Sequence, residues 1–364
     1  MNKLVSVGEY CPQCVWLSLC GGCEQLWYVE NEKQHPEYSV YCLHPERNDF
    51  AERVTEIGGF SIASIRAVEQ KIPSFPGVIP MMRKDDLQGQ WGAFSYVAIA
   101  MRDLLSRDLS MPTLRSTHRL RPRTPLLITG CCQDPVLESL WVKRESRELI
   151  AMLHRERPCL MFAPDFSLYV GFPRCTHQFN TKRSLLMFEI FQKAGLASVP
   201  FVSLHNEFDV KKWSEWLGGN PAVRTAAVSF QTLKNARRLW LTSASLLERL
   251  DRGTGCRIHW LVVGVAAGWK IRRLHSAIRS FSLLASEPVM SAVRGYQMIN
   301  GRAVENHSLE CEALVRCNLQ DLERRLWGLA VLDFDNRPPN HLSGESDTPA
   351  NRPRHEPELS LRWS

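Results

Sequence analysis

The middle of the chain alternates short apolar runs with longer segments in which apolar residues recur every three or four positions. Short runs rich in Val, Ile, Leu and Phe are typical of buried strands, and the longer spacing is typical of helices that cover them. The pattern predicts strands at residues 77–82, 125–130, 160–163, 198–203, 225–229, 259–263, 282–285 and 329–334. It predicts helices at residues 96–107, 136–154, 182–194, 210–217, 236–250, 270–280 and 309–327.

Eight strands that alternate with helices over about 260 residues are more typical of a (β/α)8 TIM-like barrel than of an open doubly wound sheet. The first and last strands have the weakest pattern, and without either of them the α/β barrel would be incomplete. We predict three parts: a Cys-rich N-terminal module over residues 1–72, the barrel over 73–335, and a tail over 336–364. The tail is rich in Pro, Ser, Asn and charged residues, and we expect it to be disordered.

Four closely spaced cysteines near the N-terminus form two C-x2-C pairs, and a fifth cysteine follows after eighteen intervening residues. They are Cys11, Cys14, Cys20, Cys23 and Cys42. The C-x2-C spacing lets two thiolates converge on one metal. Four thiolates suit Zn2+, whereas a [4Fe–4S] cluster commonly takes its fourth thiolate from further along the chain, as Cys42 would provide. The five residues between the pairs are few for a zinc ribbon and favour the cluster, with unligated thiols or a disulfide as the alternatives.

The remaining cysteines are scattered through apolar or helical stretches, which is typical of reduced structural thiols. The first ten residues lack the apolar run of a signal peptide, and no stretch reaches the eighteen uninterrupted apolar residues expected of a membrane span. We therefore expect a cytoplasmic protein with no membrane partner. The sequence predicts no particular oligomeric state.

Positive charge is concentrated in one segment of a chain whose formal net charge is +7. Its arginines are Arg115, Arg119, Arg121 and Arg123. Such a segment can contact the phosphates of a nucleic acid or nucleotide, and we expect it at the rim where the strands end, guiding an anionic substrate. The alternative is a solvated loop whose arginines pair with nearby acids.

Polar residues follow the ends of several predicted strands. In a parallel barrel, active sites lie where strands end and the next loops begin. Asp165, Asp134 and His205 supply carboxyl and imidazole groups for general acid and base catalysis. Hydroxyl and amide groups for binding a polar substrate come from Ser167, Asn206, Ser229 and Gln231. We expect these residues to line one pocket.

Local structure offers a second interpretation of the same residues. Asp134 stands before a proline at a predicted helix start, where an aspartate commonly caps the helix, and Asp165 can close a turn. Ser229 can satisfy loop backbone groups. Cys131 and Cys132 are adjacent, so their side chains point in different directions, and packing is a commoner role for cysteine than reactivity.

The sequence Phe-Ala-Pro-Asp-Phe-Ser-Leu-Tyr over residues 162–169, with Phe172-Pro173, the helix near 182–184 and the strand near 197–203, resembles an uncharacterised bacterial and phage family of barrel proteins. The resemblance spans about residues 159–300. It implies a barrel in which Asp165 belongs to a recurring Pro-Asp-Phe-Ser motif, and it implies no substrate. A more remote, fold-level analogy is to tRNA-guanine transglycosylases, which use carboxylates for base exchange, although no base-exchange motif is found in this sequence.

Motifs of several common enzyme classes are absent from the sequence. It has no C-x3-C-x2-C triplet of standard radical S-adenosylmethionine enzymes, no Walker loop, no dinucleotide fingerprint and no H-E-x-x-H. We expect a metal- or iron–sulfur-containing barrel enzyme that acts on a nucleobase, nucleotide or similar polar substrate, in a mobile-element or phage-defence setting. The alternative is a non-catalytic nucleic-acid-binding or regulatory protein that uses a zinc knuckle and the basic segment.

Overall fold

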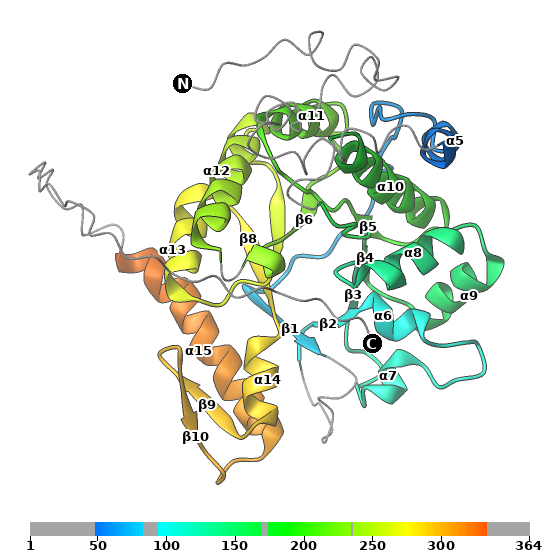
Figure 1. Ribbon diagram of the computed structural model, residues 1–364. Helices are drawn as coiled ribbons and strands as arrows, with labels where there is room; N and C mark the ends of the chain where they lie inside the picture. Colours follow the sequence, from blue (N-terminus) through cyan, green and yellow to red (C-terminus); the bar gives the residue numbers. More distant parts are fainter. Residues whose placement is uncertain (1–47, 83–93, 169–173, 234–235, 333–364) are drawn as a thin grey trace, which may run out of the picture.

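Eight parallel strands form the centre of the molecule in the computed structural model, which describes residues 48–82, 94–168, 174–233 and 236–332 (Figure 1). The strands are β1 (Val78–Met82), β2 (Val97–Ala100), β3 (Leu126–Thr129), β4 (Leu160–Phe162), β5 (Ser198–Val199), β6 (Thr225–Ser229), β7 (His259–Val263) and β8 (Phe281–Ala285). Their order in the sheet is β5-β4-β3-β2-β1-β8-β7-β6.

The sheet curves until its two edge strands meet. Beyond β5, Phe201 forms a parallel bridge with Ala227 of β6. Two backbone hydrogen bonds support this bridge, from Val202 N to Ala227 O at 2.8 Å and from Ala227 N to Pro200 O at 2.9 Å. The protein is therefore an α/β protein with a nearly closed barrel, consistent with a TIM-like architecture.

Helices surround this barrel and, from β2 onward, separate its strands in the sequence (Figure 1). They are α5 (Asn48–Glu56), α6 (Met101–Leu105), α7 (Leu114–Thr117), α8 (Asp134–Val142), α9 (Arg147–Glu156), α10 (Arg174–Lys193), α11 (Glu207–Gly218), the 3-10 helix η4 (Gln231–Leu233), α12 (Arg237–Gly253), α13 (Gly268–Ala277), α14 (Glu287–Val293) and α15 (Cys311–Leu332). An antiparallel hairpin, β9 (Tyr296–Ile299) and β10 (Arg302–Glu305), lies between α14 and α15.

The strands are apolar along almost their whole length because both of their faces are covered. Side chains on one face fill the barrel, and those on the other pack under the helices. In β1, for example, all five residues are buried, and in β3 all four are. This burial explains why these strands appear in the sequence as continuous apolar runs rather than as alternating patterns.

The prediction of eight strands is confirmed in number, but two members differ. Residues 96–107, predicted as a helix, begin with the buried strand β2, and only Met101–Leu105 are helical. Pairing of Val97 with Leu126 and of Ile99 with Ile128 overrides the helical spacing of this segment. The predicted strand at 329–334 was wrong, because α15 continues to Leu332.

One predicted helix is two helices in the structure. Residues 136–154 break between α8 and α9, where Ser146 becomes an N-cap whose hydroxyl accepts a hydrogen bond from Leu149 N at 3.5 Å. Glycines end two of the helices. Gly195 adopts a φ of +73° after α10, and Gly219 is the C-cap of α11.

The segment between α5 and β1 runs across the N-terminal ends of the strands. It is held by hydrogen bonds from Ala67 N to the Asn220 side chain at 2.8 Å and from Ser198 N to the Gln70 side chain at 2.9 Å. Phe60, which lies within the predicted N-terminal module, belongs to the same hydrophobic core as the barrel strands. In the described part of the chain, no helix combines the length and apolar character that a membrane span needs.

Candidate functional site

The loops that follow β3 and β4 meet at a glycine. A Cβ atom on Gly130 would lie 2.2 Å from the carbonyl oxygen of Ala163 and 2.8 Å from the Cα of Pro164. Because these are backbone atoms, only glycine permits so close an approach. The approach lets Asp165 N donate a hydrogen bond to Gly130 O at 3.0 Å. Asp165 is thereby fixed beside the loop that carries Cys131 and Asp134.

The side chains of residues 165–167 point alternately toward the candidate site and into the core. Phe166 is buried, and the guanidinium of Arg183 lies 4.0 Å from its ring centroid. Its neighbours Asp165 and Ser167 are only half-buried, as expected where an extended chain directs successive side chains to opposite sides. Helix α10 holds this loop, because Ser184 donates a hydrogen bond to Pro164 O at 2.7 Å and Asn180 donates one to Ser167 O at 2.8 Å.

Asp165 has a strongly altered acidity. Burial of its carboxyl group, followed by the negative charge of Asp134, raises its pKa to about 7. The Ser167 hydroxyl donates a hydrogen bond to Oδ1 of Asp134 at 2.6 Å. Asp134 is the first residue of α8 and Gln133 is the N-cap, so the capping position predicted for Asp134 belongs to its neighbour. Two carboxyl groups thus lie together at the C-terminal ends of β3 and β4.

A cysteine completes the cluster. The pKa of the Cys131 thiol is raised well above its usual value by burial and by the nearby charge of Asp165, while a hydrogen bond with Ser229 opposes this rise. Ser229 ends β6, so the cluster spans the barrel from β4 to β6. Cys132 points elsewhere, since its sulfur accepts a hydrogen bond from Arg102 N at 3.2 Å. The prediction that adjacent thiols diverge is confirmed.

Gln231 lies against the end of β7. A Cβ atom on Gly264 would be 2.5 Å from Gln231 Cγ and 2.8 Å from its backbone nitrogen, and Gly264 has a φ of +84°. Gln231 N also donates a hydrogen bond to Ser229 Oγ at 3.2 Å. These contacts place Gln231 at the same end of the barrel as Ser229 and Cys131.

Two predicted site residues have local roles. The Asn206 side chain is the N-cap of α11 and accepts hydrogen bonds from Phe208 N and Asp209 N at 3.0 Å and 3.2 Å. The His205 ring packs edge to face against His177 of α10, with ring centroids 4.7 Å apart. The side-chain oxygen of Asn206 is therefore already used in capping α11. His205 lies in the loop after β5, and its ring is held against His177.

The basic segment does not lie where the sequence predicted. The Arg115 side chain donates hydrogen bonds to the carbonyl oxygens of Thr124 and Arg157, which precede β3 and β4. Arg119, Arg121 and Arg123 are exposed in the connection from α7 to β3. The segment is at the N-terminal ends of the strands, because α7 packs where β3 and β4 begin. The expectation that it guides a substrate into the opposite mouth was wrong.

The predicted metal ligands Cys11, Cys14, Cys20, Cys23 and Cys42 lie outside the described residues. Among the residues that the structure does describe, no group of three or more His, Cys, Asp or Glu side chains is placed to hold a metal ion.

Sequence reasoning missed two features that bear on function. Cys131 was interpreted as a packing residue, although its position directly after Thr129-Gly130 at a strand end could have identified it. No predicted site residue pointed to a pocket at the opposite end of the barrel. There, Arg224, Arg257 and Arg279 each precede one of three successive strands by one or two residues.

The comparisons with known proteins do not identify a family. No family model matches the chain, and no curated protein matches it. One similar solved structure is a cube-shaped, highly porous protein cage designed by fusing symmetric oligomeric domains, at 8% identity and a TM-score of 0.36, covering 73% of this chain and 76% of that chain. A likeness at this TM-score carries no argument about the present chain.

Proposed function

We propose that the chain is a TIM-like barrel enzyme in which Asp165 moves a proton to or from a polar substrate bound at the C-terminal mouth. The observation that carries this proposal is the raised pKa of Asp165, about 7, at the end of a barrel strand. A carboxyl group with this pKa is present in both protonation states near neutral pH, as general acid–base catalysis requires. A structural carboxylate has no need of such an environment, and perturbed pKa values concentrate at functional sites.

The neighbouring residues support distinct roles. The negative charge of Asp134 raises the pKa of Asp165 and so favours its protonated form. The Ser167 hydroxyl holds the Asp134 carboxylate in place by a hydrogen bond. Cys131 remains a thiol at neutral pH because its pKa is raised. It therefore lines the site as a weak hydrogen-bonding group and does not act as a nucleophile. The chemistry we propose is therefore proton transfer between Asp165 and the substrate, without a covalent enzyme intermediate on cysteine.

A nucleobase, nucleotide or similar polar molecule fits this set of groups. A protonated carboxylic acid donates one hydrogen bond and accepts another, which matches the amide and amidine edges of nucleobases. Gln231 and Ser229 lie at the same end of the barrel and offer further donors and acceptors. The N-terminal cysteines remain our candidate ligands for Zn2+ or a [4Fe–4S] cluster, and no step of the proposed proton transfer depends on them.

The test compares binding with turnover. The purified full-length protein is incubated with pooled nucleobases, nucleosides and nucleotides, and products are followed by mass spectrometry. Asp165→Asn should retain substrate binding and lose turnover by a factor of about 100 or more, which is the usual size of an acid–base contribution. Glu287→Gln is the matched control, because Glu287 is also the first acidic residue after a strand, β8, but is exposed at the start of α14. Full turnover by Asp165→Asn would contradict the proposal.

A further inference from the structure

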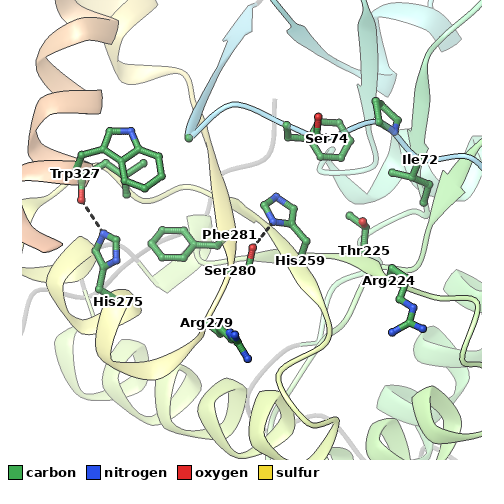
Figure 2. A pocket seen from close by; sticks show the side chains of 14 residues that line it. Ile72, Ser74, Arg224, Thr225, His259, His275, Arg279, Ser280, Phe281 and Trp327 are labelled. Carbon is green, nitrogen blue, oxygen red and sulfur yellow. Dashed lines mark hydrogen bonds between the residues drawn. The ribbon is translucent and has the colours of Figure 1, made fainter.

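A cavity of about 650 Å3 opens at the N-terminal ends of β6, β7 and β8 (Figure 2). The cluster around Asp165 lies at the opposite, C-terminal ends of the strands. One of its walls is formed by residues 72–75 of the segment that crosses this end of the barrel, and another by Leu326 and Trp327 of α15. Pockets of this size commonly bind small molecules. Because catalytic sites of such barrels lie at the other end, a pocket at this end is suited to binding rather than to catalysis.

Aromatic rings line this cavity. Phe75 stacks on His259 with ring centroids 6.0 Å apart and an angle of 20° between the planes, and Phe281 packs against His275 at 5.0 Å. Figure 2 shows Phe281 between the two histidines in that view. The Trp327 side chain borders the same space and is 59% exposed, an unusually large exposure for tryptophan. Flat rings that reach an open cavity favour a ligand with a flat ring of its own.

His259 is fixed at the centre of this wall. Its Nδ1 lies 2.7 Å from Ser280 Oγ and its Nε2 lies 3.0 Å from Ser282 Oγ. Burial lowers the pKa of His259, so the ring is neutral at neutral pH. It therefore acts as an aromatic surface of fixed orientation and contributes no charge of its own.

The charge of the cavity is positive. Arg224 and Arg279 line it, and none of the described lining residues is acidic. Neither arginine forms an ion pair with another residue of the described part of the chain. Burial, followed by the positive charge of Arg224, lowers the pKa of nearby Arg257. The two arginines precede β6 and β8, which flank β7, so their backbones are about 10 Å apart at the usual strand spacing.

We infer that this cavity is a second binding site, for a small anion that carries a flat ring, with a nucleoside monophosphate as the simplest member of that class. The ring lies among Phe75, Phe281 and Trp327. The phosphate is held by Arg224 and Arg279. Each guanidinium group can donate two parallel hydrogen bonds to phosphate oxygens. This site is independent of the proposed acid–base chemistry, since its residues come from the opposite ends of the strands.

Isothermal titration calorimetry of the full-length protein tests the inference, with AMP and GMP as probes and with adenosine and inorganic phosphate as their separate halves. We expect both monophosphates to bind at least tenfold more tightly than either half. Replacing both arginines, Arg224→Gln with Arg279→Gln, should weaken AMP binding at least tenfold. Trp327→Ala should weaken AMP binding severalfold and leave the binding of inorganic phosphate unchanged, because only the ring contact is removed.

Two controls separate this site from the barrel mouth. The double variant Arg294→Gln with Arg302→Gln removes the same charge from exposed positions outside the cavity and should bind AMP normally. Gln231→Ala, which removes a hydrogen-bonding side chain at the barrel mouth, should also bind AMP normally. Absence of AMP and GMP binding at millimolar concentration would overturn the inference, as would adenosine binding as tightly as AMP. AMP binding that survives the double replacement of Arg224 and Arg279 but is weakened in Gln231→Ala would assign the nucleotide to the barrel mouth and overturn it as well.

Discussion

Ser167 and Asp134 join two loops that are more than thirty residues apart in the sequence. The Ser167 hydroxyl donates a hydrogen bond to Oδ1 of Asp134 at 2.6 Å, from the loop after β4 to the first residue of α8 after β3. This bond holds the Asp134 carboxylate beside Asp165, whose pKa is raised by burial and by that charge. The same bond thus links the position of one acid to the protonation of the other.

The first prediction concerns pH and stability. The folded-state pKa of Asp165 is about 7, above the ordinary aspartate value of 3.8, so folding favours the protonated form. Stability from this group is fully present below about pH 4 and is lost as pH rises through 7. Between pH 5 and pH 8 the wild-type protein should lose on the order of 2 kcal/mol relative to Asp165→Asn, which cannot ionise.

Urea denaturation of both proteins at pH 5 and pH 8 measures this difference. Glu287→Gln serves as the control, because it removes a carboxyl group that is exposed at the surface. An equal free-energy difference between wild type and Asp165→Asn at both pH values would show that Asp165 ionises normally.

The second prediction separates the two causes of the raised pKa. Asp134→Asn removes the nearby negative charge and leaves the burial of Asp165 in place. The pKa of Asp165 should therefore fall below 7 but stay above its ordinary value, because burial is the larger cause. Carbon-13 NMR of labelled aspartate carboxyl groups measures the pKa directly. A pKa unchanged by the substitution would exclude charge coupling between these two residues.

Much of this fold is predictable from the sequence for a simple physical reason. Strands such as β6 and β7 are short apolar runs bounded by polar residues, and their predicted and observed limits coincide. Strand β2 could not be predicted in this way. Its four residues are also compatible with a helix, and only pairing with β1 and β3 selects the extended form. Local pattern does not contain that information.

The candidate site was predictable to a similar degree. Four of the predicted residues stand at or just after the ends of strands: Asp134, Asp165, Ser167 and Ser229. Because the strands are parallel, their C-terminal ends lie on one face of the barrel, and these residues lie close together there. Asn206 also follows a strand, yet its side chain caps α11. A cap and a ligand-binding amide have the same sequence signature, so spacing cannot separate them. The basic segment Arg115–Arg123 could be placed only once the position of α7 was known. Helix α7 precedes β3 and lies at the N-terminal ends of the strands.

The third prediction tests the close approach at Gly130. Gly130→Ala would place a Cβ 2.2 Å from the Ala163 carbonyl oxygen, and that backbone must move. We expect a loss of about 2 kcal/mol in the free energy of unfolding, typical of overpacking, together with a shift of the Asp165 pKa as its loop is displaced. Gly218→Ala is the control, because no atom lies within 4 Å of a Cβ there and the site is helical. It should leave stability unchanged or increase it. Equal effects of the two substitutions would contradict the contact.

The fourth prediction concerns the N-terminal cysteines. If Cys11, Cys14, Cys20 and Cys23 share one site, protein purified without oxygen should contain about one zinc ion or about four iron ions per chain, because these are the loads of a zinc site with four thiolate ligands and of a [4Fe–4S] cluster. Metal analysis with visible absorption spectroscopy distinguishes the two.

Replacement of Cys11 and Cys14 by serine should remove the metal whichever it is, because thiolates are the ligands in both cases. Cys42→Ser should remove iron from a cluster that takes its fourth ligand there, and should leave unchanged a zinc ion held by the other four. Cys317→Ser, in α15, is the matched control and should retain all the metal. Full metal content in the Cys11 and Cys14 double variant would exclude the proposed site, since a tetrahedral centre cannot lose two of its thiolates and keep its affinity.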